Sequence, residues 1–162
     1  SQRKRDAQEI RSLANRLIAL APAKLAQVPL DEMVRTEIER ARAIRSNVAR
    51  KRQAQYVAKL LRRGGAEEAA DALDAFDDDA RQLNARHHRA EAWRDHVLEN
   101  GDVAVGQLLE QRRDADAQAL RQLLRNARRE AERNKPPSAA RALFRILREL
   151  DESTPLPPVR ST

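Results

Sequence analysis

Hydrophobic residues recur every three or four positions along most of the chain, which is the spacing of a helix that buries one side. This pattern predicts a first helix over residues 5–21, a second that begins after Asp31, and a third that runs from the Ser46-Asn47 break to Gly64. No segment alternates between apolar and polar residues as a half-buried strand would. The pattern therefore predicts an all-α fold.

The longest helical pattern covers residues 67–99 and closes at Asn100-Gly101, a typical helix C-terminus. Three consecutive aspartates at residues 77–79 lie between Phe76 and Ala80 of its apolar stripe. The sequence therefore predicts either one long helix or two helices with a bend at these aspartates.

Three shorter helices are predicted in the rest of the chain. Asp102 would cap the first, and Asp114 or Asp116 would cap the second. Two prolines at positions 136 and 137 then break the pattern, because proline disfavours helix in the residue before it and suits the first turn of a new one. The last helix would run from Ser138 to Leu150, and the proline-rich residues 151–162 would form a disordered tail.

These elements predict two small helical bundles, residues 1–65 and 101–150, joined by a long helix over residues 66–100. The bundles could be copies of one another. A shift of 86 positions superposes Val34 on Leu120 and Leu61 on Leu147, among other pairs. Leucine-rich helices also match by chance, so the sequence leaves an internal duplication open.

Charge is distributed unevenly over these segments. Residues 1–65 hold 16 basic and 6 acidic side chains, residues 66–100 hold 4 and 10, and residues 101–162 hold 12 and 9. Of the 32 basic residues 27 are arginine, whose planar guanidinium group binds phosphate through paired hydrogen bonds. A GC-rich genome would explain part of the arginine excess, but not the segregation of charge. The sequence therefore predicts two basic bundles and an acidic connecting helix.

The composition excludes several classes of protein. The chain has no cysteine, which rules out disulfides and thiolate metal sites and fits a reducing, cytoplasmic setting. No run approaches the roughly 18 apolar residues of a membrane helix, and no phosphate-binding glycine loop or nucleophile elbow occurs. We therefore predict a cytoplasmic protein with no cofactor, no small-molecule substrate, no membrane contact and no enzymatic activity.

A metal site is the one catalytic feature that the residues suggest. His87, Glu91 and Asp95 are spaced by four residues, so a helix would place imidazole and carboxylate groups on one face. One helix supplies too few ligands, however, and no second histidine cluster completes the set. A solvated face of a charged helix explains the same residues, and we favour that interpretation.

Basic side chains that avoid the apolar stripes are the best candidates for a binding site. The candidate RNA-binding residues are Arg45, Arg50, Lys51, Arg52, Lys59, Arg62, Arg63, Arg121, Arg125, Arg128, Arg129, Asn134, Lys135, Arg141, Arg145 and Arg148. Cationic helix faces attract a polyanion through counterion release, whereas the alternative is a solvated surface without a ligand. Because the chain has only four aromatic residues, base stacking cannot be the main readout, and we expect recognition of RNA shape and phosphate geometry.

Seven short motifs occur in order along the chain. They are Lys4-Arg5-Asp6-Ala7, Val28-Pro29-Leu30-Asp31, Arg50-Lys51-Arg52-Gln53, Leu60-Leu61-Arg62, Arg125-Asn126-Ala127-Arg128-Arg129-Glu130, Asn134-Lys135-Pro136-Pro137-Ser138-Ala139-Ala140-Arg141 and Leu147-Arg148-Glu149-Leu150. The Asn-Lys-Pro-Pro turn between basic flanks is the most specific of them. With these motifs, over about residues 3–150, the chain resembles the YjgA family, also called the dual-action ribosomal maturation protein (DarP) family.

The resemblance implies a factor that joins late precursors of the large (50S) ribosomal subunit near the maturing peptidyl-transferase region and promotes folding of ribosomal RNA. Its partners would be ribosomal RNA, precursor particles and ribosomal proteins. The family carries an acidic leader before the Lys4 motif, so a leader is expected to be missing from a sequence that begins at Ser1. The second hypothesis is a helical adaptor that docks a basic protein on the acidic helix.

Overall fold

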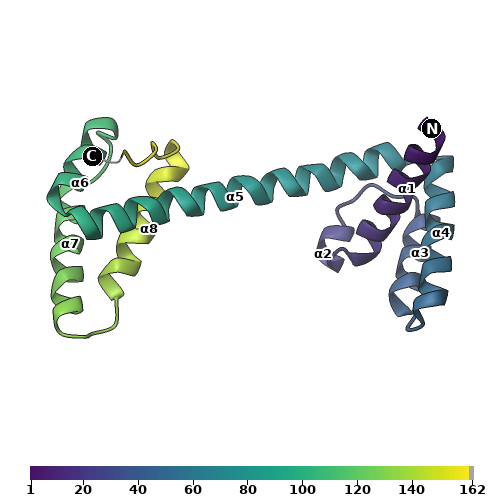
Figure 1. Ribbon diagram of the computed structural model, residues 1–162, viewed down its shortest axis with the longest axis horizontal. Coiled ribbons are helices and arrows are strands. Elements are labelled where there is room, and N and C mark those ends of the chain that lie inside the picture. Colours follow the sequence, from purple (N-terminus) through teal and green to yellow (C-terminus); the bar gives the residue numbers. More distant parts are fainter. Residues whose placement is uncertain (161–162) are drawn as a thin grey trace. The chain divides into compact units, whose positions relative to one another are not determined.

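The computed structural model describes residues 1–160, and this part of the chain forms eight α-helices and no strand (Figure 1). The helices are α1 (Gln2–Ala19), α2 (Pro22–Leu25), α3 (Glu32–Ala43), α4 (Asn47–Arg63), α5 (Ala66–Asn100), α6 (Asp102–Gln111), α7 (Ala117–Glu132) and α8 (Ser138–Ser153). The predicted all-α class is confirmed. None of these helices combines the length and the apolar composition that a bilayer crossing requires.

Local sequence signals set the starts of several helices. Ser46 precedes α4, and its side chain accepts a hydrogen bond from the backbone N–H of Ala49 at 3.4 Å. Asp116 caps α7 in the same way through Ala119 at 3.0 Å. Asp31 occupies the predicted N-cap position of α3, but its side chain makes no capping hydrogen bond. The positions of polar residues therefore predict where these helices begin, but they do not predict which side chains form capping hydrogen bonds with the first backbone N–H groups.

The helices form two units, of which unit 1 is Ser1–Asp79 and unit 2 begins at Ala80. In unit 1, α1, α3 and α4 pack against one another, and the first turns of α5 complete the core. The buried core residues are Leu13, Ala14, Leu17, Leu25, Val28, Val34, Ile38, Val57, Ala58, Leu60, Leu61, Ala69 and Leu73. Arg35 fastens the loop before α3, because its guanidinium group donates to the carbonyls of Leu25 and Val28, both at 2.8 Å.

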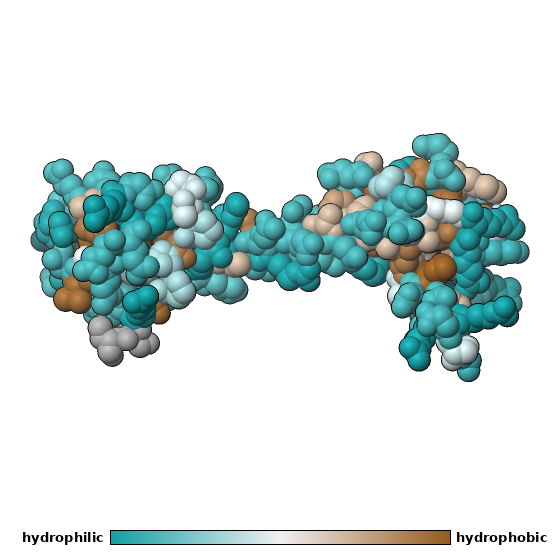
Figure 2. Space-filling model, turned by 90° about the horizontal axis from the view of Figure 1, so that it is seen from above, coloured by the Kyte–Doolittle hydropathy of each residue, from teal (hydrophilic) through white to brown (hydrophobic). Residues whose placement is uncertain are grey.

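Unit 2 is built around Trp93, whose side chain is almost fully buried. The last part of α5 packs with α6, α7 and α8, and α7 and α8 run along each other. The buried core residues are Ala90, Trp93, Val97, Ala104, Val105, Leu108, Leu120, Leu124, Leu143, Leu147 and Leu156. The face seen in Figure 2 is mostly hydrophilic, with apolar residues in separate patches.

Residues 66–100 form one continuous helix, so the aspartates at 77–79 introduce no break. This helix is also not a separate segment between two bundles. Its residues Ala69 and Leu73 belong to the core of unit 1, whereas Trp93 and Val97 belong to the core of unit 2. The units therefore divide within α5, between Asp79 and Ala80, whereas the predicted helices suggested bounds at residues 65 and 100.

The end of the described chain differs from the predicted disordered tail. Helix α8 continues to Ser153, and Leu156 is only 3% exposed. The indole Nε1 of Trp93 donates a hydrogen bond to the carbonyl of Pro157 at 2.6 Å. Proline-rich composition suggested disorder, but Leu156 supplies an apolar side chain that the core of unit 2 buries. Residues 161 and 162 of the predicted tail lie outside the described residues.

Candidate nucleic-acid interface

In unit 1 most candidate residues lie on the outer side of α4. Val57 and Leu61 face the core and are almost fully buried. The basic residues on the opposite side are Lys51, Arg52, Lys59, Arg62 and Arg63, and all five are exposed. None of the five forms an ion pair with a carboxylate among residues 1–160. This side of α4, which we call the α4 basic face, is therefore open to an external anion.

Arg45 and Arg50 lie where the chain enters α4. Arg45 is exposed in the loop before the helix. Arg50 is also exposed, but its Nε and one terminal nitrogen donate to the carbonyl of Ile44 at 3.2 and 2.7 Å. Arg50 therefore shapes the loop and keeps only part of its guanidinium group for a ligand.

In unit 2 the arginines of α7 and α8 lie away from the leucines of the same helices. On α7, Leu120 and Leu124 are buried, whereas Arg125 and Arg129 are exposed. Arg121 is half-buried, and its Nε donates to Asp102 at 2.7 Å in a solvent-accessible ion pair, which contributes little to stability. On α8, Arg141 and Arg145 are exposed and Arg148 is half-buried. We call these arginines of α7 and α8 the α7–α8 basic face.

Arg128 of α7 has a structural contact that spacing could not reveal. Its guanidinium group lies against the backbone of Gly101, so closely that a Cβ atom there would clash with it. Gly101 has a φ of +66°, a conformation that glycine adopts without strain. The glycine thus permits both the turn between α5 and α6 and the close approach of Arg128. Arg128 consequently has less freedom to reach a ligand than Arg125 or Arg129.

The predicted Asn-Lys-Pro-Pro turn ends α7 with a defined motif. Asn134 has a φ of +53°, and the backbone N–H groups of Asn134 and Lys135 donate to the carbonyls of Ala131 and Glu130 at 3.3 and 2.9 Å. Both side chains are exposed. The carboxylate of Glu130 accepts from the N–H of Ala139 at 2.9 Å, so an internal anion already occupies the N-terminus of α8.

Asp151 of α8 has a buried carboxyl group that stays charged. Burial would raise its pKa, but hydrogen bonds from Arg89 at 2.7 and 3.0 Å and from the N–H of Leu156 at 2.9 Å, with the charge of Arg89, lower it below the usual aspartate value. The hydrogen bond to Asp151 raises the pKa of Arg89 in turn. The pair thus fixes the end of α8 to α5 within unit 2.

This pair predicts a pH dependence of stability. Because the folded-state pKa of Asp151 is depressed, its stabilising effect is complete above the unfolded value of about 3.9 and is lost as pH falls through the folded value. We expect acid unfolding of unit 2 to be less steep in Asp151→Asn, measured by circular dichroism between pH 5 and pH 2. Some pH dependence of stability should remain in this variant, because the pKa of Asp114 is also lowered, by its hydrogen bond to Arg112. The exposed neighbour Glu152→Gln is the control, and equal slopes in both variants would contradict this role.

The residues proposed as a possible metal site pair with their own neighbours. Nε2 of His87 lies 2.8 Å from the carboxylate of Glu91, and the carboxylate of Asp95 pairs with Arg94 at 3.0 Å. Among the residues that the structure describes, no group of three or more histidine, aspartate or glutamate side chains is arranged to hold a metal ion.

The fold also groups polar residues that the sequence analysis did not single out. Asn15 of α1 and Arg42 of α3 lie beside Arg50 and Lys51 of α4 around one hollow in unit 1. Helical spacing within α4 could identify the last two, but it gives no information about neighbours on other helices.

These observations define the class, a small all-α protein whose helices carry arginine-rich outer faces. A family model for dual-action ribosomal maturation protein DarP matches residues 1–148. A curated relative of that name from Xanthomonas oryzae pv. oryzae (strain KACC10331 / KXO85) is 48% identical over 155 residues, which cover 94% of this chain and 80% of the relative. Another, from Stenotrophomonas maltophilia (strain R551-3), is 42% identical over 156 residues, covering 93% and 78%. The chain belongs to the DarP family of ribosomal maturation proteins.

Proposed function

We propose that this chain binds ribosomal RNA in late precursors of the large ribosomal subunit, in the cytoplasm, and promotes maturation of the peptidyl-transferase region without catalysing a reaction. One observation carries the proposal: the exposed basic residues of the α4 basic face, together with Arg125, Arg129, Arg141 and Arg145 of the α7–α8 basic face, have no carboxylate partner within residues 1–160. Such groups can exchange their counterions for RNA phosphates. The maturation role named for the relatives is consistent with an RNA ligand.

Two basic faces in one chain suggest how such a protein would act. When one face holds an RNA element, the tether raises the effective concentration of the other face at a second element. The entropic cost of docking the two elements falls, although no bond is made or broken. The exposed acidic residues in the first half of α5, such as Asp71 and Asp79, would repel RNA from this part of the helix.

Reversing two charges on the α7–α8 basic face tests the proposal. We expect Arg125→Glu combined with Arg129→Glu to weaken binding to large-subunit precursors roughly ten- to hundredfold, because two phosphate contacts become repulsive. Co-sedimentation with precursor particles in sucrose gradients measures the loss. Both side chains are exposed, so helical content should not change. Arg128 is left intact because of its packing against Gly101.

The matched control is Arg113→Glu combined with Arg160→Glu. These residues are exposed, lie in unit 2 and give the same change of net charge, but neither belongs to α7 or α8. The control variant should retain most of the binding. Equal losses in both double variants would indicate that only net charge matters, and full retention in both would argue against this face.

The second candidate function is a protein–protein adaptor that docks a basic partner on α5. The observation that favours it is the set of exposed acidic residues in the first half of this helix, Glu67, Glu68, Asp71 and Asp79. Nuclease treatment separates the two functions, since binding through RNA disappears and binding to a ribosomal protein persists. A salt titration adds a second criterion, because RNA binding should weaken steeply with salt.

A further inference from the structure

A hollow of about 510 Å³ lies in unit 1 and is lined by residues of α1, the end of α3 and the start of α4. Its lining residues are Asn15, Ile18 and Ala19 of α1, Arg42 of α3, and Asn47, Arg50, Lys51 and Ala54 of α4. The volume falls within the range of about 300–1,000 Å³ that is usual for sites that hold small ligands. The hollow is thus large enough for one nucleotide and too small for an RNA double helix.

All charged residues that line this hollow are basic. Its lining holds three cationic residues and no carboxylate, and an adjoining hollow of about 90 Å³ adds Arg11. A second cleft of unit 1, of about 660 Å³, is different because its two arginines are accompanied by Glu9, Glu67 and Asp74. Absence of a carboxylate is therefore not a general property of the clefts of this unit. The first hollow is suited to an anionic group.

The polar side chains of the hollow differ in how many hydrogen bonds they already make within the protein. Arg42 donates to the carbonyl of Leu20 and lies 3.8 Å from Glu39, so it contributes mainly positive charge. Arg50 uses two of its nitrogens on Ile44. Lys51, Asn15 and Asn47 are exposed and make no side-chain hydrogen bond within the described chain. Asn47 is also the first residue of α4, where backbone N–H groups and the helix dipole favour an anion.

The remaining lining is aliphatic, from Ile18, Ala19 and Ala54. A bare phosphate would not require such a surface, whereas a nucleotide presents a phosphate, an apolar ring face and a polar base edge together. Asparagine side chains both donate and accept hydrogen bonds, as recognition of a base edge requires. Unpaired, splayed-out nucleotides are also the part of folded RNA that proteins read by sequence.

We propose that this hollow binds one unpaired RNA nucleotide, with its phosphate at Lys51 and Arg50 and its base edge toward Asn15 and Asn47. This inference rests on the proposed RNA-binding function and adds a base-reading site to faces that would otherwise contact only phosphates. Because Arg50 and Lys51 belong to the same helix as Arg62 and Arg63, a duplex on the α4 basic face could place a bulged nucleotide in the hollow.

Two RNA hairpins that differ only by one unpaired adenosine in the stem test the proposal, with affinity measured by fluorescence anisotropy. We expect the unaltered protein to bind the bulged hairpin roughly tenfold more tightly, as one or two additional hydrogen bonds would give. Asn15→Leu, which leaves charge unchanged, and Ala19→Trp, which fills the hollow, should each remove this preference. Both positions are exposed, and circular dichroism verifies that the variants are folded.

Arg62→Ala combined with Arg63→Ala is the matched control on the same helix, outside the hollow. It should weaken both hairpins equally and keep the preference. A preference that is absent in the unaltered protein, or that survives in Asn15→Leu and Ala19→Trp, overturns the inference and leaves the proposed RNA binding intact. If the unaltered protein binds neither hairpin and no precursor RNA, the proposed function fails, and this inference fails with it.

Discussion

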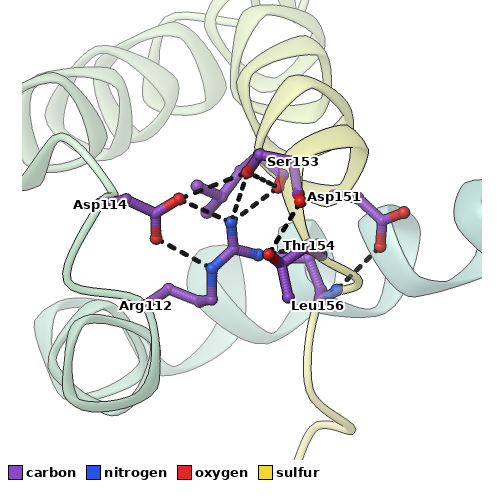
Figure 3. A network of polar contacts seen from close by, with 7 residues as sticks. Arg112, Asp114, Asp151, Ser153, Thr154 and Leu156 are labelled. Carbon is purple, nitrogen blue, oxygen red and sulfur yellow. Dashed lines mark hydrogen bonds and ion pairs between the residues drawn. The ribbon is translucent and has the colours of Figure 1, made fainter.

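Arg112→Met is expected to lower the free energy of unfolding of unit 2 by about 1–3 kcal/mol, the usual cost of leaving buried polar groups without their hydrogen-bond donor. The side chain of Arg112 is only 7% exposed. Its guanidinium group donates to both carboxylate oxygens of Asp114 at 2.9 and 2.8 Å, to the carbonyls of Leu150 and Thr154 at 2.8 and 2.5 Å, and to the hydroxyl of Ser153 at 2.9 Å (Figure 3). Methionine fills a similar volume but removes the donor to the carbonyl of Thr154 and the charged donor to Asp114, whereas the carbonyl of Leu150 keeps a hydrogen bond from the hydroxyl of Ser153.

Arg113→Met provides the control for this prediction. Arg113 is the next residue, is exposed and has no ion pair among the described residues, so its replacement should change the free energy of unfolding by no more than about 0.5 kcal/mol. Urea unfolding monitored by Trp93 fluorescence measures both variants, because the only tryptophan of the chain lies in the core of unit 2. Similar midpoints for the two variants would show that the network contributes little.

The burial of Arg112 and the exposure of Arg113 could not be predicted from the sequence. Helical periodicity locates the helices, because a leucine such as Leu124 or Leu147 must be buried and its spacing fixes which side is inward. The same pattern cannot distinguish Arg112 from Arg113. Arg112 is buried because α6 ends beside the end of α8, where unpaired carbonyls need a donor. The order of the chain end was missed for the same reason, since it depends on contacts with Arg112 and Trp93.

The local sequence left open whether α5 continues through residues 77–79. Three consecutive aspartates concentrate negative charge in one turn, and the sequence predicted either one helix or a bend there. In the structure, Arg16 of α1 lies 2.8 Å from Asp77 and 3.9 Å from Asp74, which partly compensates this charge. The pairing could not be predicted from spacing, because the two helices are separated by three others along the chain.

Only part of the candidate interface could be predicted from the sequence. The α4 and α7–α8 basic faces follow from periodicity, because residues opposite to buried leucines must point outward. Side chains that meet from different helices do not follow from it. Periodicity could assign neither the contact of Arg128 with Gly101 nor the neighbours Asn15 and Arg42 of the hollow in unit 1. It therefore predicts exposed charge well and predicts a concave site poorly.

Trp93→Ala is expected to destabilise unit 2 by about 3–5 kcal/mol, the usual cost of removing a large aromatic side chain from a core. The indole is 1% exposed and lies among α5, α6, α7 and α8. Its loss leaves a cavity and also removes the hydrogen bond to the carbonyl of Pro157. Hydrogen exchange measured by mass spectrometry should show lower protection throughout unit 2. Protection in α1, α3 and α4 should not change, because the core of unit 1 shares no residue with this cluster.

Trp93→Phe separates the two contributions of the indole. Phenylalanine keeps an aromatic ring in the core but cannot donate to Pro157, so its cost should be smaller, about 1–3 kcal/mol. Faster exchange should then concentrate in the peptide that covers the end of α8 and residues 154–160. Should the phenylalanine variant lose protection evenly over unit 2, packing alone would explain the effect of Trp93. A loss confined to the chain end would show that the indole N–H, together with Asp151, holds Leu156 in place.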